Sequence, residues 1–398
     1  MRRGLIASVV AVAVLASAGA DSARAQSFYE GKTVRIIVGL AAGGGFDTYA
    51  RVLARHWGKH IPGNPTIIVE NMVGAGSLIA ANHLYRVAKA DGLIVGNFDG
   101  SLVLSQVLGQ PGIEFDARKF HFIGATAREE VVCALTKASG ITSLDKWMAA
   151  TAPVKLGGIL PGATPDKAGR TLKAALGLPI QVVTGYKGTS EIRLAATGGE
   201  LAGACWSWES MRAAWRNALD AGEVVPIVQV TAKPFPDLPN VPLAVNLAKN
   251  DEARRLIQVA VQNVSAYARP FVLPPATPKE RVQLLRKAFQ ETLKDPAFLA
   301  EIEKTKLTLD PVTGEELEKL VADAFTIEPA LSAKLKAIQK KYPNNELPAP
   351  VYAQYKKIQA QTDAAYKRYS ASIDATNKLI VARNAIARRY NQAAACKP

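Results

Sequence analysis

Two glycine-rich turns, each placed between an apolar β-like run and a helix-like run, constrain the fold of this chain more than any other feature. The first turn, Gly39–Gly45, follows the run Thr33–Val38, and the second, Gly74–Gly76, follows the run Thr66–Glu70. A helix that begins directly after a strand exposes N–H groups without intrahelical partners, and its dipole favours negative charge. The two turns therefore predict an α/β protein that holds a small anion between loops.

Residues 1–25 have the pattern of a secretory signal. A positive start at Arg2 and Arg3 precedes the apolar stretch Gly4–Ala18, and Ala23-Arg24-Ala25 forms a small-x-small cleavage site. No later stretch is apolar over the length that a spanning helix needs. We expect an exported protein with no direct membrane insertion.

The chain without this signal is strongly basic. It carries 46 Lys and Arg against 33 Asp and Glu, a net charge of +13. The sequence has no zinc finger, RNA-binding signature or clear helix-turn-helix, so nucleic acid is not an expected partner. The charge instead favours anionic solutes and anionic envelope surfaces.

The middle of the chain alternates strand-like and helix-like stretches, which predicts two α/β lobes with parallel sheets. Pro234–Pro242 has four prolines in nine residues and is interpreted as a linker or crossing segment. The expected strands are Val34–Val38, Thr66–Val69, Leu93–Phe98, Phe120–Ile123, Val131–Leu135, Val154–Leu156, Ile180–Val183, Leu201–Cys205 and Val224–Val230.

The composition changes beyond Pro343. Tyr352, Tyr355, Tyr366 and Tyr369 recur at helical spacing, which predicts a helical extension over residues 344–398. The extension would pack on the main body or bind a partner, and both alternatives stay open.

Three cysteines are too few for a disulfide scaffold. Export permits a bridge between Cys133 and Cys205. Both residues lie in apolar runs, where a buried free thiol is more common, so free thiols are the expectation. Cys396 would be an exposed thiol on the tail.

Catalytic signatures are not recognisable. His56 and His60 are four residues apart on one expected helix, but no HExxH pattern accompanies them, and a solvated pair near the helix end is expected rather than a metal site. There is no Gly-x-Ser-x-Gly elbow, no phosphate-binding loop and no complete dinucleotide fingerprint. The sequence therefore predicts binding without catalysis, cofactor or metal.

An ordered set of motifs resembles the periplasmic solute-binding proteins of tripartite tricarboxylate transporters, the TctC or Bug family. The resemblance extends from about Tyr29 to Ile338. The matching segments are Lys32–Val38 with Gly43–Asp47, Val69–Gly76, Ala90–Gly92, Gly185–Glu191, Leu238–Pro242, Pro274–Pro278, Lys294–Pro296 and Val312–Leu317.

The resemblance implies a type II periplasmic-binding-protein fold, with two lobes and a central cleft, plus the C-terminal helical extension. Lobe 1 would comprise residues 26–124 and 245–343, and lobe 2 residues 125–244. The ligand would be a small carboxylate, delivered in the periplasm to a small and a large membrane subunit.

The family's binding segments carry over to four loops of this chain. Lobe 1 would contribute the two turns, and lobe 2 two segments that face the cleft. A tryptophan at the end of the Leu201–Cys205 strand could also contact the ligand. The implied ligand-binding residues are Ala42, Gly43, Gly44, Gly45, Asp47, Asn71, Gly74, Ala75, Gly76, Ser77, Gly162, Thr164, Gly188, Thr189, Ser190, Trp206 and Trp208.

The first turn departs from the family pattern. Ala41 and Ala42 replace prolines that are frequent there, and Phe46 replaces a small polar residue. These changes leave an aromatic or aliphatic acid open beside a tricarboxylate. Two other function classes also stay open: a periplasmic sensor that signals through a partner, and a hydrolase with a Ser or Cys nucleophile, which lacks a recognisable base.

Overall fold

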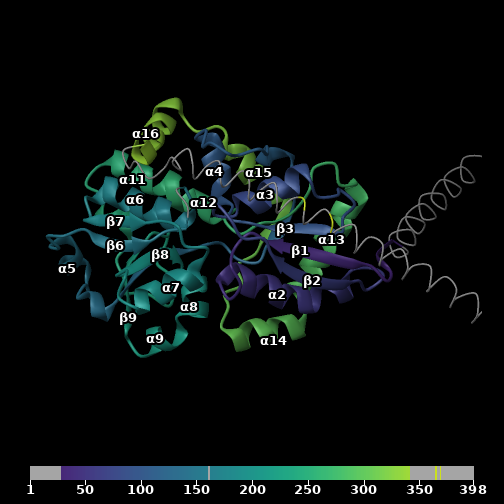
Figure 1. The fold of residues 1–398 in the computed structure, drawn as a ribbon, viewed down its shortest axis with the longest axis horizontal. Coiled ribbons are helices and arrows are strands. Elements are labelled where there is room, and N and C mark those ends of the chain that lie inside the picture. Colours follow the sequence, from purple (N-terminus) through teal and green to yellow (C-terminus); the bar gives the residue numbers. More distant parts are fainter. Residues whose placement is uncertain (1–27, 160–161, 341–363, 365–367, 369–398) are drawn as a thin grey trace, which may run out of the picture.

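The computed structural model describes residues 28–159 and 162–340, together with the isolated positions 364 and 368. The predicted signal at 1–25 and Cys396 lie outside the described residues, as does the predicted extension at 344–398 apart from those two positions. The described chain forms two β-sheets, each covered by helices, which lie beside one another (Figure 1).

The first sheet has the strand order β11-β4-β10-β3-β1-β2. β1 pairs in parallel with β2 and β3, whereas β10 runs antiparallel to both β3 and β4, and β11 runs antiparallel to β4. The bounds are β1 Thr33–Val38, β2 Thr66–Asn71, β3 Ile94–Asn97, β4 His121–Ala125, β10 Phe271–Leu273 and β11 Val312–Thr313.

The second sheet has the order β7-β6-β8-β5-β9. β6 is parallel to β7 and β8, and β5 is antiparallel to β8 and β9. The bounds are β5 Val131–Thr136, β6 Val154–Gly157, β7 Ile180–Val183, β8 Gly203–Ser207 and β9 Val224–Gln229.

Both sheets are mixed, so the expectation of parallel sheets is wrong in part. The parallel strands are those joined by a crossover helix, as β1 and β2 are by α2 (Gly45–Trp57). The antiparallel strands β10 and β5 begin where the chain enters a sheet from the other lobe. Their direction depends on those long connections, for which the local sequence pattern carries no signal.

Helices precede or follow nearly every strand, as the alternation predicted. The helices up to β9 are α2, η1 Gly58–His60, α3 Leu78–Arg86, α4 Ser101–Val107, η2 Ala117–Lys119, η3 Lys137–Ser139, α5 Leu144–Met148, α6 Thr164–Leu176, α7 Thr189–Thr197, α8 Trp208–Ala214 and α9 Arg216–Asp220. Those after β9 are α10 Ala244–Leu247, α11 Asp251–Ile257, the π-helix η4 Gln258–Gln262, α12 Asn263–Ser265, α13 Lys279–Thr292, α14 Pro296–Thr305, α15 Gly314–Ala324 and α16 Pro329–Lys340.

Two chain segments cross between the sheets. Residues 126–130 connect β4 to β5, and residues 266–270 connect α12 to β10. A backbone hydrogen bond of 3.0 Å from the Glu129 N–H to the Ser265 carbonyl joins their ends. The predicted lobe limits stay a prediction. Because α10, α11 and η4 pack on α6 of the second sheet, the packing favours a return crossing at 266–270 rather than at 245.

Cys133 and Cys205 form a disulfide, so the expectation of free thiols is wrong. The two residues lie directly opposite one another on the adjacent antiparallel strands β5 and β8. Directly opposed residues bring their Cβ atoms within bonding range of a bridge. Apolar surroundings alone did not reveal this register.

Pro234–Pro242 contains neither helix nor strand, which confirms that it is a connecting segment. The Gln229 side chain secures it by donating to the carbonyls of Leu238 and Val241, at 2.9 and 2.6 Å. Among the described residues, no helix has the length and apolar character that a membrane crossing requires.

Candidate functional site

The first glycine turn ends at the N-terminus of α2. Gly43 has a φ of 76°, which favours glycine, and Gly44 offers no side-chain cap to the helix. The Gly43 N–H donates instead to Asp47 Oδ2 at 2.9 Å. Helix geometry leaves the first N–H groups of α2 without intrahelical acceptors, so this turn has the donors that an anion needs.

Asp47 stabilises this turn through hydrogen bonds. Arg51 and Asn71 both donate to its carboxylate, at 2.9 and 3.0 Å, in addition to the Gly43 N–H. Burial acts to raise the pKa of Asp47, but these hydrogen bonds outweigh it and lower the pKa. A second hydrogen bond, from the Asn71 amide to the Leu40 carbonyl at 2.9 Å, ties the end of β2 to the turn. Asp47 and Asn71 therefore fix the geometry of the first turn.

The second turn adopts a left-handed backbone at non-glycine residues. Ala75 has a φ of 47° and Ser77 a φ of 74°. Ser77 is fully buried, its hydroxyl makes no hydrogen bond to any described residue, and it does not cap α3. A Cβ on Gly39 would lie 2.6 Å from that hydroxyl, so the two turns touch only because residue 39 is glycine. Such strain and an unused polar group are typical of functional sites.

The second lobe covers the first turn. The Ser190 hydroxyl donates to the Ala42 carbonyl at 3.4 Å, and the Ala41 N–H donates to the Lys187 carbonyl at 3.4 Å. A Cβ on Gly44 would lie 3.0 Å from the Thr189 hydroxyl, and one on Gly188 would lie 3.3 Å from Ala41. The structure thus brings the predicted residues 42–45 and 188–190 into contact.

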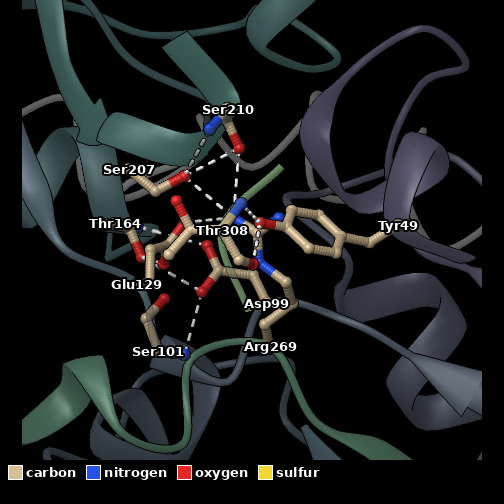
Figure 2. Close-up of polar contacts among 9 residues, drawn as sticks. All are labelled: Tyr49, Asp99, Ser101, Glu129, Thr164, Ser207, Ser210, Arg269 and Thr308. Carbon is tan, nitrogen blue, oxygen red and sulfur yellow. Dashed lines mark hydrogen bonds and ion pairs between the residues drawn. The ribbon is translucent and has the colours of Figure 1, made fainter. Parts of the chain in front are cut away.

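Thr164, the predicted residue at the start of α6, joins a buried polar network at the base of the two lobes (Figure 2). Its N–H donates to Asp99 at 3.2 Å, and its hydroxyl lies 3.1 Å from Glu129 Oε2. Ser101 contributes an N–H to Asp99 at 2.9 Å and donates its hydroxyl to the Gly162 carbonyl at 3.1 Å. These contacts connect both lobes with the crossing at 126–130.

Arg269, on the other crossing, occupies the centre of this network (Figure 2). Its Nη2 donates to the hydroxyls of Ser207 and Ser210, at 2.8 and 3.1 Å, and lies 3.6 Å from Glu129. The rings of Phe46 and Tyr49 lie 4.7 and 4.8 Å from its guanidinium carbon. One side chain therefore contacts α2 of the first lobe and α8 of the second.

Two buried glutamates surround this arginine. Burial raises the pKa of Glu129 to about 7, although the nearby Arg269 charge opposes the shift. Burial also raises the pKa of Glu209 to about 8, and no other described residue forms a hydrogen bond with its carboxylate. Lys167 is buried nearby, and burial lowers its pKa to about 8. The base of the cleft therefore holds charges whose state depends on pH near neutrality.

The sequence reasoning missed Asp99, Glu129, Ser207, Ser210 and Arg269. A weak signal existed, because charged residues that directly follow or precede an apolar strand point to the edge of a sheet. Asp99 follows β3, and Glu129 precedes β5. No local pattern indicated that these two residues would meet.

Trp206 and Trp208 pack within the second lobe. The Trp206 ring lies 4.8 Å from the Trp215 ring, and the Trp208 indole N–H donates to Asp237 at 3.4 Å. Both side chains are buried. Their contact with a ligand stays a prediction.

His56 and His60 form half-buried contacts with acidic residues, so the expectation of a solvated pair is wrong. His56 lies 2.6 Å from Glu301, and His60 lies 2.7 Å from Asp295. These contacts join the end of α2 to α14, and the end of η1 to Asp295, the N-cap residue of α14. Within the described part of the chain, no cluster of His, Cys, Asp and Glu could hold a metal ion.

A cavity of about 470 Å³ lies elsewhere, between η4, α15 and α16. None of the predicted binding residues lines it. A much smaller cavity of about 10 Å³ lies at the cleft base, where Glu129, Thr164 and Lys167 contribute to its walls. At the first glycine turn the two lobes are in direct contact, through the hydrogen bond from the Ser190 hydroxyl to the Ala42 carbonyl.

The fold and the site define a class: a two-lobed α/β binding protein whose strand-to-helix turns meet at an interlobe cleft. Solved structures support this fold. The periplasmic binding protein BugD is 20% identical, covers 77% of this chain and 97% of its own, and gives a TM-score of 0.63. MatC from Rhodopseudomonas palustris with bound malate is 19% identical, covers 77% of this chain and 99% of its own, and gives a TM-score of 0.61. An R. palustris protein solved with adipate is 20% identical, covers 78% of this chain and 97% of its own, and also gives a TM-score of 0.61.

The family is shown by sequence. Residues 49–336 match the model of the tripartite tricarboxylate transporter family receptor, TctC, so this chain belongs to that family. A curated relative, the UPF0065 protein in the TAR-I ttuE-ttuC' intergenic region of Agrobacterium vitis, is 29% identical over 292 residues, which span 70% of this chain and 76% of the relative. The family consists of solute receptors rather than enzymes.

Proposed function

We propose that this protein captures a small carboxylate in the periplasm and delivers it to the small and large membrane subunits of a tripartite tricarboxylate-type transporter. The observation that carries the proposal is the contact between the two glycine turns, each at the N-terminus of a helix. Helix N-termini bind carboxylates through free N–H groups and the helix dipole. Malate and adipate, the ligands of two structural neighbours, are both dicarboxylates.

The second turn would supply one end of the carboxylate clamp. Ser77 offers a buried hydroxyl without a partner among the described residues, at the start of α3 beside Gly74, Ala75 and Gly76. The first turn would supply the other end through Ala42, Gly43, Gly44 and Gly45. Gly162, Thr164, Gly188, Thr189 and Ser190 would close over the ligand from the second lobe.

Asp47 and Asn71 would act indirectly. Three groups of the chain already donate to the Asp47 carboxylate, and the Asn71 amide bonds with Leu40, Asp47 and Arg51. Their proposed role is to hold the first turn in its binding geometry. Phe46 contributes an apolar ring next to that turn, which favours ligands with an aliphatic or aromatic body.

Isothermal titration of the purified, signal-processed protein tests the proposal. Malate, adipate, citrate and benzoate would be compared with their uncharged amides. Binding of at least one acid, and of no amide, supports carboxylate capture, whereas a protein that binds none of the acids contradicts it. Co-purification with membrane subunits encoded beside its own gene would test the transporter assignment separately from that of a sensor.

Ser77→Ala examines the clamp directly. It removes the unpartnered hydroxyl, and we expect weaker carboxylate binding with an unchanged melting temperature. The matched control is Ser139→Ala, which also removes a serine hydroxyl, one in η3 that donates to the Thr136 carbonyl at 2.6 Å. Equal affinities for both variants would remove Ser77 from the clamp.

A further inference from the structure

Arg269 has hydrogen-bond donors that the protein does not use. Its side chain is fully buried, yet only Nη2 has acceptors, the hydroxyls of Ser207 and Ser210. Nε and Nη1 have no acceptor among the described residues. Burying a charged donor without an acceptor costs free energy, and native structures seldom leave one unexplained.

The neighbouring carboxylates leave these donors unused. Glu129 lies nearest to Nη2, at 3.6 Å, and its other oxygen faces the Thr164 hydroxyl at 3.1 Å. Glu209 is buried close enough to feel the Arg269 charge, but no other described residue forms a hydrogen bond with its carboxylate. Nη2 shares one edge of the guanidinium with Nε and another with Nη1, so a carboxylate from outside the chain could accept from Nη2 and either unpartnered nitrogen.

The guanidinium also lies close to the end of the first glycine turn, because Ser210 is a neighbour of both. A Cβ on Gly45 would meet the Ser210 hydroxyl at 1.9 Å, and that hydroxyl lies 3.1 Å from Arg269 Nη2. Phe46 and Tyr49, from the first two turns of the same helix, lie against the guanidinium. The Ser210 hydroxyl thus lies between the buried cation and the N-terminus of α2.

We infer that Arg269 is a specificity-determining residue that donates to the ligand's carboxylate from Nη2 together with Nε or Nη1. This inference rests on the proposed function and names the side chain that selects charge at the same site. When the second lobe moves away, Ser210 leaves the space between α2 and the guanidinium. A carboxylate that enters there meets helix N–H groups on one side and Arg269 on the other. A neutral amide would supply only one oxygen and no charge.

Calorimetric titration of Arg269→Gln with malate and adipate, beside malamide and adipamide, tests the inference. We expect at least about a tenfold loss of affinity for an acid that binds the wild-type protein, because hydrogen bonds to charged groups contribute that much. The matched control is Arg281→Gln. Arg281 stacks on Phe28 at 3.6 Å and donates to the Asp91 carbonyl at 2.8 Å, away from both turns, and its loss should leave the affinity unchanged.

A second measurement uses the wild-type protein and so does not depend on the folding of the glutamine variant. The Nε–H resonance of Arg269, assigned by its disappearance in Arg269→Lys, should shift on titration with the bound acid. An unshifted resonance, or a folded Arg269→Gln with wild-type affinity, overturns the inference and leaves the proposed function intact. A wild-type protein that binds no carboxylate overturns both.

Discussion

The Glu129 carboxylate lies 3.6 Å from the Arg269 guanidinium, and these two residues come from the two segments that cross between the sheets. Both side chains are buried, so the pair joins the crossings where solvent screens charge poorly. The same arginine reaches α2 and α8. The relative position of the lobes therefore depends on a few polar side chains at the cleft base.

Removing the acid of this pair should destabilise the protein. At pH above about 8, where Glu129 with its pKa of about 7 is ionised, Glu129→Gln leaves Arg269 without its nearest anion, and breaking a buried pair costs about 3–5 kcal/mol of unfolding free energy. Urea denaturation followed by tryptophan fluorescence measures the change. The matched control is Asp116→Asn, which breaks an ion pair with the exposed Arg118 and should cost less than about 1 kcal/mol. Equal effects of the two substitutions would contradict a structural role for the crossing pair.

Glu209 makes stability depend on pH. Burial raises the pKa of Glu209 to about 8, so the folded protein binds a proton that the unfolded chain releases near its ordinary pKa, about 4.5. Stability should therefore fall as the pH rises from about 4.5 to 8, because the folded state binds more protons over that range. Thermal melts across this range should show a smaller decline for Glu209→Gln than for the wild-type protein. An equal decline in melting temperature for the two proteins would contradict this role of Glu209.

The contact between Gly45 and Ser210 predicts a variant that favours separated lobes. Gly45→Ala introduces a Cβ that would lie 1.9 Å from the Ser210 hydroxyl, so we expect the lobes to part and the radius of gyration to rise in small-angle scattering. Gly198→Ala, whose Cβ would meet its nearest atom at 3.4 Å, should change nothing. Adding Ser210→Gly to Gly45→Ala should bring the radius of gyration part of the way back to the wild-type value. An unaltered scattering curve for Gly45→Ala would refute this prediction.

The Cys133–Cys205 disulfide should stabilise the second sheet. The bridge joins residues 72 positions apart, and cross-links of this length contribute about 2–4 kcal/mol. The double variant Cys133→Ala, Cys205→Ala should unfold at correspondingly lower urea concentration. Thiol titration of the unreduced, denatured protein should detect only Cys396, and detection of all three cysteines would show that the bridge does not form.

Much of the fold was predictable because its signals are local. The apolar runs at β1 and β2, and the glycine turns after them, follow from residue type and spacing alone. The direction of β10 was not predictable, because it depends on a connection through the second lobe. The Cys133–Cys205 bridge required the register of β5 and β8, which hydrophobicity does not determine.

The candidate site was predictable in its loops but not at its base. Gly43–Gly45 and Gly188–Ser190 could be expected to face one another because the family resemblance assigns them to opposite lobes. Arg269 could not, because it lies in a short segment between a helix and a strand, with no motif around it. Its partner Glu129 is 140 positions away in the sequence, and only the tertiary fold brings them together.

The contact between Ala41 and Lys187 gives this protein a practical use as an optical reporter. Their backbones are hydrogen-bonded where the two lobes touch. The Lys187 side chain is 70% exposed, so a dye attached at this position would have space. A fluorophore attached through Lys187→Cys, with Cys396→Ser to leave no second free thiol, would lie in one environment when the two lobes touch and in another when they separate. A change in the emission of this dye would then report a change in the contact between the two lobes.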